Sequence, residues 1–311
     1  MVHVALAGAS SGFGRTLLTH FLSQKKHHIT VLSRSENPSL TALGVTVKPA
    51  DYSSIPSLTS ALQGVHTVII TLASYDHTFA TSQLNLLEAA KEAGVKRFAP
   101  SEYAHPHYNG IDLYQPKKQV WEAVQKSGLE YTKFACGLFM NALSTGTPKG
   151  ETEALASLRP WNFIINMRAG TADVPGDGNA KMAITEINDV CRFIVASLDL
   201  EKWDEESGMV GESLSCNEII EIVEKVTGRK MLVKYNSMEE MGRGASDPGR
   251  RFYEQVRMAI ARREFVVESS LSKRLSQIKP TSVEEYLARW WSGVQLPEAK
   301  WEEDKLFGFE S

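Results

Sequence analysis

A glycine-rich turn near the N-terminus constrains the fold more than any other feature of the chain. It joins residues 2–7, an apolar run rich in strand formers, to residues 15–22, where apolar side chains recur at helical spacing. Gly8 allows a sharp turn, while Gly12 and Gly14 allow close approach of the backbone to a pyrophosphate and of the helix to the sheet. A strand, a glycine-rich turn and a helix in this order predict the opening of a nucleotide-binding βαβ unit, with phosphates at the helix N-terminus.

Strand-like and helix-like segments alternate after this turn. Strands are expected at residues 28–33, 45–48, 66–71, 95–100 and 130–136, with helices at 57–62, 78–93 and 116–126. The fourth strand, residues 66–71, is apolar almost throughout, as in strands buried on both faces of a parallel sheet. This order predicts an α/β fold with a doubly wound parallel sheet of the Rossmann type.

The rhythm changes near residue 145. Residues 144–150 are small and polar, which indicates a linker, and 311 residues are many for a single domain. We therefore expect a dinucleotide-binding domain over residues 1–145 and a smaller α/β substrate lobe over residues 146–311, parts of which pack back on the first domain. In that lobe a helix is expected over residues 249–263, and its five arginines are interpreted as a mainly solvated face.

Composition excludes several classes of function. The net charge is −3, with 34 basic against 37 acidic residues and no basic block, so no nucleic-acid partner is expected. No run of about 18 apolar residues is present, and a strand at residue 2 leaves no room for a signal peptide, so we expect a cytoplasmic protein without a membrane partner. Cys136, Cys191 and Cys216 have no metal-like spacing, and His105 and His107 are interpreted as loop histidines, so no metal is expected.

The end of the second strand indicates the cofactor. It carries Ser33 and Arg34 and no acidic residue. An acidic residue at this position favours NAD, whereas an arginine pairs with the 2′-phosphate of NADP, so the sequence predicts NADP(H). Asp51, after the third strand, has two interpretations: an acceptor for the adenine amino group, or a cap for the helix that begins near Ile55. The predicted cofactor contacts are Gly8, Ser10, Ser11, Gly12, Phe13, Gly14, Ser33, Arg34, Asp51 and, after the fourth strand, Leu72, Ala73 and Ser74.

An ordered set of short segments resembles a known family. The segments are "VLSRS" at 31–35, "GVKRFAPSEY" at 94–103, "SGLEYT" at 127–132, "VPGDG" at 174–178, "INDVCRFIVASLDL" at 187–200 and "VTGRKMLVKY" at 226–235. Together with the opening turn, they resemble the NmrA-like and isoflavone-reductase-like families, which are atypical short-chain dehydrogenases. The turn departs from the usual GxxGxxG of these families, because Ser11 stands at the middle glycine. Read as GxxxGxG, it fits ordinary short-chain dehydrogenases instead, and either form predicts the same phosphate contact.

Two registers compete for the catalytic lysine. Ser101, Tyr114 and Lys118 have the spacing of the Ser-Tyr-Lys triad of ordinary short-chain dehydrogenases, in which the tyrosine exchanges a proton with the substrate. The atypical families use a lysine upstream of a "GLxYT" strand, and this resemblance places it at Lys117, which would also contact the cofactor. Lys117 shares a helical face with Val120 and Val124. Lys117 is the favoured candidate. Lys118 remains open, as does the placement of both lysines at the surface. Two further alternatives also remain open: a loop position for Tyr114 and a backbone-capping role for Ser101.

The resemblance also implies a substrate site and an activity. The loop after the sixth strand, residues 137–141, would border the nicotinamide, where Phe139 and Met140 form an apolar substrate wall or simply interlobe core. Tyr103 is the third expected substrate contact. The implied function is NADPH-dependent reduction of a C=O, C=N or activated C=C bond in a small, largely apolar secondary metabolite by a monomer or homodimer. The alternatives are an NADP-binding regulator without turnover and a cofactor-holding enzyme that catalyses a non-redox cyclisation or isomerisation.

Overall fold

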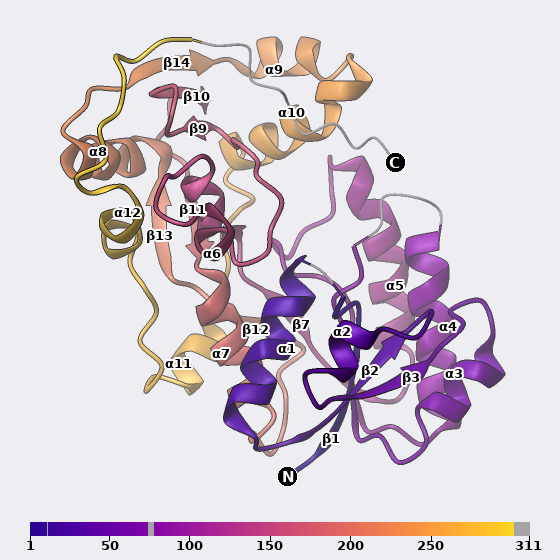
Figure 1. Ribbon diagram of the computed structural model, residues 1–311. Coiled ribbons are helices and arrows are strands. Elements are labelled where there is room, and N and C mark those ends of the chain that lie inside the picture. The colour runs from indigo at the N-terminus through magenta and orange to yellow at the C-terminus, as the bar shows by residue number, and fades with distance from the viewer. Residues whose placement is uncertain (11, 74–77, 302–311) are drawn as a thin grey trace.

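Six parallel strands form the central sheet, in the order β3-β2-β1-β4-β5-β6. The computed structural model, drawn in Figure 1, describes residues 1–10, 12–73 and 78–301. The strands are β1 (His3–Ala7), β2 (His28–Ser33), β3 (Thr46–Pro49), β4 (Thr67–Ile70), β5 (Arg97–Ala99) and β6 (Glu130–Tyr131). The order reverses between β1 and β4, and ligands of such sheets bind at this reversal, beyond the carboxyl ends of the strands. The predicted Rossmann-type α/β fold is confirmed.

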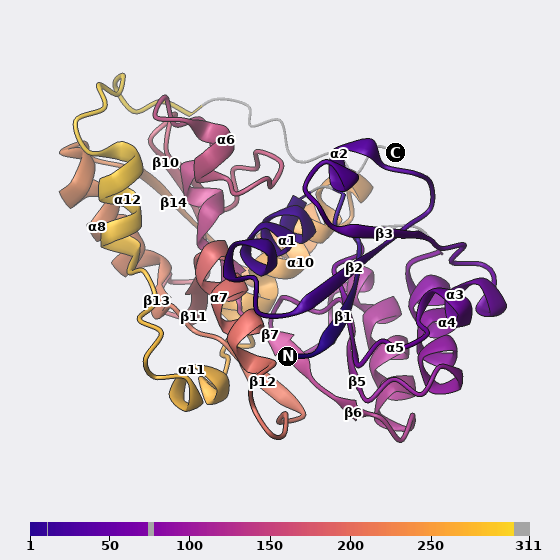
Figure 2. The same cartoon turned by 60° about the horizontal axis from the view of Figure 1, so that its bottom comes forward.

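Helices cover both faces of this sheet (Figure 2). They are α1 (Gly12–Gln24), α2 (Pro38–Thr41), α3 (Ile55–Ala61), α4 (Thr78–Glu92) and α5 (Gln115–Gln125), with a 3-10 turn, η1 (Asp112–Tyr114), before α5. Side chains of β1 alternate between the faces: Val4 and Leu6 pack in the cluster that contains α1, whereas Ala5 and Ala7 pack with α3, α4 and α5. All four are fully buried, which is why the strand reads as a continuous apolar run.

The predicted sixth strand, residues 130–136, is divided in two. β6 ends the central sheet, while β7 (Lys133–Ala135) pairs in parallel with β12 (Glu206–Gly208). Thr132, at the division, is buried, and its hydroxyl donates to the Ser207 hydroxyl at 2.8 Å. The division moves the chain from the central sheet toward the second lobe.

The second lobe contains two small sheets and most of the remaining helices. One sheet has the order β13-β11-β8, from β8 (Leu138–Phe139), β11 (Lys181–Thr185) and β13 (Glu212–Ser215). The other has the order β14-β10-β9, from β9 (Ile165–Asn166), β10 (Thr171–Pro175) and β14 (Leu232–Asn236). The helices are η2 (Met140–Ser144), α6 (Glu151–Ala154), α7 (Ile187–Ser197), α8 (Cys216–Thr227), α9 (Met238–Gly244), α10 (Pro248–Ala261), α11 (Ser270–Arg274) and α12 (Val283–Trp291).

Helix α7 belongs by packing to the sheet with β1. Its apolar residues, among them Val190 and Phe193, share one buried cluster with Leu17 and Phe21 of α1. The division of the chain at residue 145 stays a prediction. Within the described ranges, no helix is long and apolar enough to cross a membrane.

The interpretation of residues 249–263 as a mainly solvated arginine face is wrong for Arg257. Its side chain is 1% exposed and pairs with Glu254 at 2.7 Å and with Asp173 at 3.2 Å. Arg250, on the same helix α10, pairs with the other oxygen of Glu254 at 2.8 Å. One buried carboxylate, on Glu254, and one half-buried carboxylate, on Asp173, thus explain why an arginine is tolerated inside the lobe.

Candidate active site

The glycine-rich turn has the geometry of a phosphate cradle. Gly8 and Gly12 lie at φ +92° and +57°, in the left-handed region that favours glycine. A Cβ on Gly14 would lie 2.2 Å from the Gly8 carbonyl oxygen and 2.3 Å from the Thr71 hydroxyl, so glycine is required where α1 packs on the strand ends. A Cβ on Gly12 would meet nothing nearer than the Ser157 carbonyl oxygen, at 3.9 Å. The turn therefore leaves open space beside Gly12 at the N-terminus of α1, and contact with a pyrophosphate there stays a prediction.

The other predicted residues of the turn differ in their surroundings. Ser10 is exposed, and Ser11 lies outside the described residues. The Phe13 side chain is buried, with ring centroids 4.6 Å from Tyr103 and 5.6 Å from Phe139. Phe13 can therefore face a cofactor only through its backbone.

The end of β2 is followed by an exposed basic side chain. Arg34 is exposed, and the Ser33 hydroxyl donates to the Ser35 carbonyl at 2.7 Å. Burial raises the pKa of Tyr52, and the Arg34 charge lowers it. The position of Arg34 beyond the strand suits a 2′-phosphate.

Asp51 does not cap a helix, so that interpretation is wrong. The N-cap of α3 is Ser54, whose hydroxyl accepts from the Ser57 backbone N–H at 3.3 Å. The Asp51 carboxylate instead accepts from the backbone N–H of Ser53 at 2.9 Å and from its hydroxyl at 2.7 Å. The other interpretation, a contact with adenine, stays a prediction.

The structure brings Lys117, and not Lys118, to the end of β5. The Lys117 ammonium donates to the carbonyl oxygens of Ser101 at 3.0 Å and Glu102 at 2.5 Å. It also lies 5.4 Å from the Tyr114 ring centroid. The Lys118 side chain is 50% exposed and pairs with Glu122 at 3.4 Å, on the solvent face of α5. The triad spacing that ends at Lys118 therefore does not correspond to a cluster in space.

Ser101 ties two strand ends together. Its hydroxyl donates to the Leu72 carbonyl at 2.8 Å, beyond β4, and its backbone N–H donates to the Gln83 side chain at 2.8 Å. This is the backbone-capping role that was left open. Leu72 is partly buried and Ala73 is exposed at the same edge, while Ser74 lies outside the described residues.

Two of the three expected substrate contacts lie in the core. The Tyr103 ring packs 4.6 Å from Phe13 and 6.3 Å from Phe134, and its hydroxyl is buried. Met140 is 0% exposed within the core of the second lobe. Other residues enclose both side chains, as the core alternative expects for Met140, and a substrate contact of Tyr103 or Met140 stays a prediction. Phe139 is half-buried beside Phe13.

Aromatic side chains from both lobes meet next to Lys117 instead. The ring centroid of Phe252, on α10, lies 6.3 Å from Tyr114 and 6.2 Å from Trp161. The Gln255 side chain of α10 accepts from the Asp112 backbone N–H at 3.0 Å, which links that helix to η1. Trp161 and Phe252 were missed because they lie 44 and 135 residues after Lys117 (161 − 117; 252 − 117), and no local pattern relates them.

The surroundings of the His105 ring were also not evident from the sequence. Its Nδ1 accepts from the His107 backbone N–H at 3.1 Å, and its ring lies 4.1 Å from Phe265 and 5.4 Å from Tyr114. Burial lowers the pKa of His105 to about 3, so the ring is neutral at physiological pH. The only early signal was its place in the polar loop that follows the fifth strand. In the described part of the chain, no group of His, Cys, Asp or Glu side chains could hold a metal ion.

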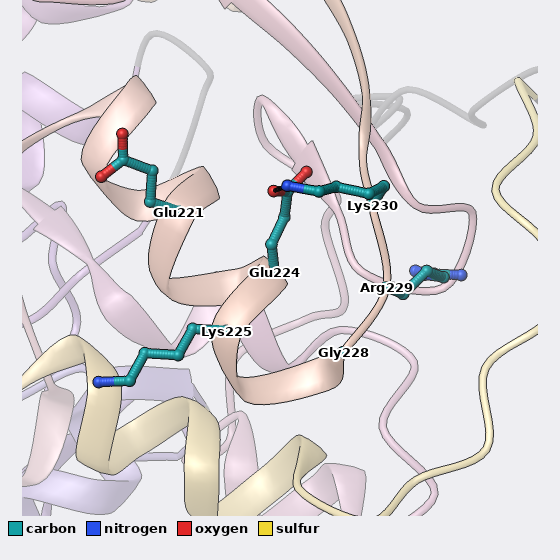
Figure 3. A pocket seen from close by; sticks show the side chains of 6 residues that line it. All are labelled: Glu221, Glu224, Lys225, Gly228, Arg229 and Lys230. Carbon is teal, nitrogen blue, oxygen red and sulfur yellow. Dashed lines mark hydrogen bonds and ion pairs between the residues drawn. The ribbon is translucent and has the colours of Figure 1, made fainter.

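A hollow on α8 is separate from this site. Figure 3 shows its lining, from Glu221, Glu224, Lys225, Gly228, Arg229 and Lys230, around about 370 Å³. Lys230 pairs with Glu224 at 2.5 Å, and Arg229 donates to the Pro297 carbonyl at 2.9 Å. Because most of its charged groups are partnered within the chain and α8 lies away from α5 (Figure 1), this hollow has no part in the chemistry considered below.

Comparison with known proteins identifies the family. A model of the NmrA-like family matches residues 2–287. The chain belongs to the NmrA-like family. It is similar to "Oxidoreductase BOA1" of Botryotinia fuckeliana, with 35% identity over 238 residues that cover 74% of this chain and 77% of that protein.

More distant members have names that describe reductases. "Probable pinoresinol-lariciresinol reductase 3" of Arabidopsis thaliana is 28% identical over 243 residues, which cover 73% of this chain and 74% of that protein. The solved complex of leucoanthocyanidin reductase from Vitis vinifera with NADPH superposes with a TM-score of 0.74 at 19% identity, over 93% of this chain and 99% of the other. At this identity the structural likeness establishes the fold.

Proposed function

We propose that this member of the NmrA-like family is an NADPH-dependent reductase of a C=O, C=N or activated C=C bond in a small, largely apolar secondary metabolite. The observation that carries the proposal is the Lys117 ammonium, held by two carbonyl oxygens at the end of β5. It lies at the strand edge that the glycine-rich turn also borders, and an aromatic cluster from the second lobe lies beside it. The reductase names of relatives and the NADPH complex of a structural neighbour support the same assignment.

The residues present fit NADP(H). The open space at Gly12 and the N-terminus of α1 would hold the pyrophosphate, and Arg34 would hold the 2′-phosphate. When bound, NADPH supplies the hydride. Location in the cytoplasm and a monomeric or homodimeric state remain predictions.

Lys117 would handle the proton of the reaction. Burial lowers the pKa of Lys117, so its ammonium releases a proton more readily than a solvated lysine does, while the charge on Glu102 opposes this shift. Two of the three N–H groups of the ammonium are used by the Ser101 and Glu102 carbonyls, which fix its direction. The third is available for the ribose of the cofactor or for the developing negative charge of the substrate. The rings of Tyr114, Trp161 and Phe252 would exclude water from this side.

Paired substitutions of adjacent lysines test the proposal. Lys117→Met keeps most of the side-chain length and removes the charge, and Lys118→Met is the matched control on the solvent face of α5. Turnover of NADPH with a panel of ketones, imines and enones should fall by about 10²–10⁴-fold in Lys117→Met, the usual contribution of a positioned acid–base group. It should change less than about threefold in Lys118→Met, because an exposed ion pair contributes little.

The outcomes separate the alternatives. Full activity in Lys117→Met would refute the role given to this lysine. Tight NADPH binding without oxidation by any substrate of the panel would favour a regulator, and product formation without NADPH consumption would favour a non-redox enzyme.

A further inference from the structure

Glu102 carries a carboxyl group that the proposed reaction does not use directly. It follows β5 in the chain, is 3% exposed, and its Oε1 has no hydrogen-bond partner in the part of the chain that the structure describes. Burial of an ionised carboxylate without compensation is costly. A group of this kind is retained against a free-energy cost, which points to a role beyond packing.

Four titratable groups face this carboxyl from different elements. They are Lys117 on α5, Lys133 on β7, Tyr108 in the loop after β5 and Glu206 on β12. Burial raises the pKa of Glu102 to about 7, the two lysines and then Tyr108 lower it, and Glu206 raises it. Glu102 therefore changes its charge near neutral pH. Its own backbone carbonyl accepts from the Lys117 ammonium at 2.5 Å, so this buried carboxyl belongs to a residue that contacts Lys117 directly.

Lys133 has a carboxylate partner of its own. Its ammonium pairs with Glu206 at 2.9 Å, donates to the Pro106 carbonyl at 3.0 Å and lies 4.7 Å from the Trp121 ring centroid. Its side chain is 3% exposed, so this environment is complete without Glu102.

Lys117 has no such partner. Among the described residues, no carboxylate lies within ion-pair distance of its ammonium, and only backbone carbonyls accept its hydrogen bonds. Burial lowers the pKa of Lys117, and the charge of Glu102 is the largest influence that raises it, followed by Cys136. The charged form of Lys117 therefore depends on Glu102.

We propose that Glu102, whose backbone carbonyl accepts from the Lys117 ammonium, is a positioning residue whose buried carboxylate keeps that ammonium charged. This inference rests on the proposed function for its catalytic consequence, but its electrostatic part does not. When Glu102 is neutral, Lys117 loses its proton at a lower pH. Lys117 then loses its donated proton at a lower pH, so the alkaline limb of the pH–rate profile shifts to lower pH.

The experiment compares Glu102→Gln with Glu122→Gln, a matched control that removes the same charge on the solvent face of α5. The rate at which trace acetic anhydride labels Lys117, followed by mass spectrometry across pH in the cofactor-free protein, gives the titration midpoint of Lys117 without any turnover. The midpoint should fall by about one pH unit or more in Glu102→Gln, the usual effect of removing an opposite charge near a lysine shielded from solvent. It should not move in Glu122→Gln and should return toward wild type in Glu102→Asp. The alkaline limb of kcat should move in parallel.

An unchanged Lys117 midpoint in folded Glu102→Gln overturns the proposal. If that variant does not fold, carbon-13 NMR of the glutamate carboxyls decides by a comparison of the wild-type protein with Lys117→Met, with the Glu102 signal assigned by its absence from Glu102→Asp. A Glu102 titration midpoint that is the same in both proteins would then overturn the proposal, because coupling between two sites is reciprocal. Absence of reductase activity would refute the proposed function and leave the labelling result intact.

Discussion

Three glycines of this chain separate the packing role of the phosphate turn from its binding role. We compare Gly12→Ala, Gly14→Ala and Gly94→Ala. Gly94, after α4, lies at φ +74° with nothing within 4 Å of an added Cβ, and Gly12 lies at φ +57° with its nearest neighbour at 3.9 Å. Both alanines would suffer only the strain of left-handed backbone, about 1–2 kcal/mol. Gly94→Ala is therefore a control for strain without proximity to the site.

Gly14→Ala differs because the added carbon meets backbone. Its Cβ would lie 2.2 Å from the Gly8 carbonyl oxygen and 2.3 Å from the Thr71 hydroxyl, so α1 must move away from β1. Overpacking usually costs about 1–3 kcal/mol, and an obstacle made of backbone places this variant at or above the upper end. Urea unfolding without cofactor should therefore rank Gly14→Ala well below the other two variants, which should be nearly equal.

Cofactor affinity should give a different order. In Gly12→Ala the new methyl group occupies the space at the N-terminus of α1, so at least one charge-assisted hydrogen bond to a phosphate is lost. Such a bond contributes about 1.5–3 kcal/mol, which corresponds to roughly 10–150-fold in the Kd for NADPH measured by calorimetry. Gly94→Ala should bind as wild type does. Equal affinities of Gly12→Ala and Gly94→Ala would refute the turn as the phosphate site, and equal stabilities of Gly14→Ala and Gly94→Ala would refute the close packing of α1.

Two further substitutions test Arg34 and Arg257. Arg34→Ala should weaken NADPH binding by about tenfold or more, through loss of a charge-assisted phosphate contact, and leave NADH binding unchanged; an equal loss for both cofactors in calorimetry would contradict the assignment. Arg257→Met leaves Glu254, 2% exposed, without its buried partner. Removal of one member of a buried ion pair costs about 3–5 kcal/mol, whereas Arg251→Met, at an exposed position of α10, should cost less than about 1 kcal/mol. Denaturant unfolding checks both, and a loss in Arg257→Met no larger than that in Arg251→Met would show that the buried network adds no stability.

Local patterns were sufficient for the central sheet. The apolar runs, the glycine-rich turn and the spacing within helices are properties of neighbouring residues, and the strands formed where these patterns placed them. Such patterns could not show that the strand predicted at residues 130–136 is divided in two. Its division at Thr132 depends on the Ser207 hydroxyl, 75 residues away, and the apolar run itself contains no signal for a break.

The same local patterns could not predict which side chains are buried by contacts between distant elements. The sequence pattern predicts that Arg257 is one of several arginines on a solvated face. Its partner Asp173 lies in β10, far from Arg257 in the sequence, so the local pattern gives no sign of the ion pair. Tyr103, which follows a strand, is predicted as a substrate contact, but its ring packs in the core between Phe13 and Phe134. In both cases the deciding contacts come from elements that the sequence does not place relative to one another.

The choice between Lys117 and Lys118 depends both on the local sequence pattern and on contacts between distant elements. Helical periodicity put Lys117 on the face of Val120 and Val124, and both valines are fully buried against the sheet. Periodicity could not show what surrounds the ammonium. The buried cations Arg257 and Lys133 have carboxylates within ion-pair distance, whereas the half-buried Lys117 has none among the described residues. The cost of burying Lys117 is therefore offset less by the fold than that of the other two. Local costs of this kind concentrate at functional sites, and this is the physical reason to look for the chemistry of the protein at Lys117 and at the buried carboxyl of Glu102 beside it.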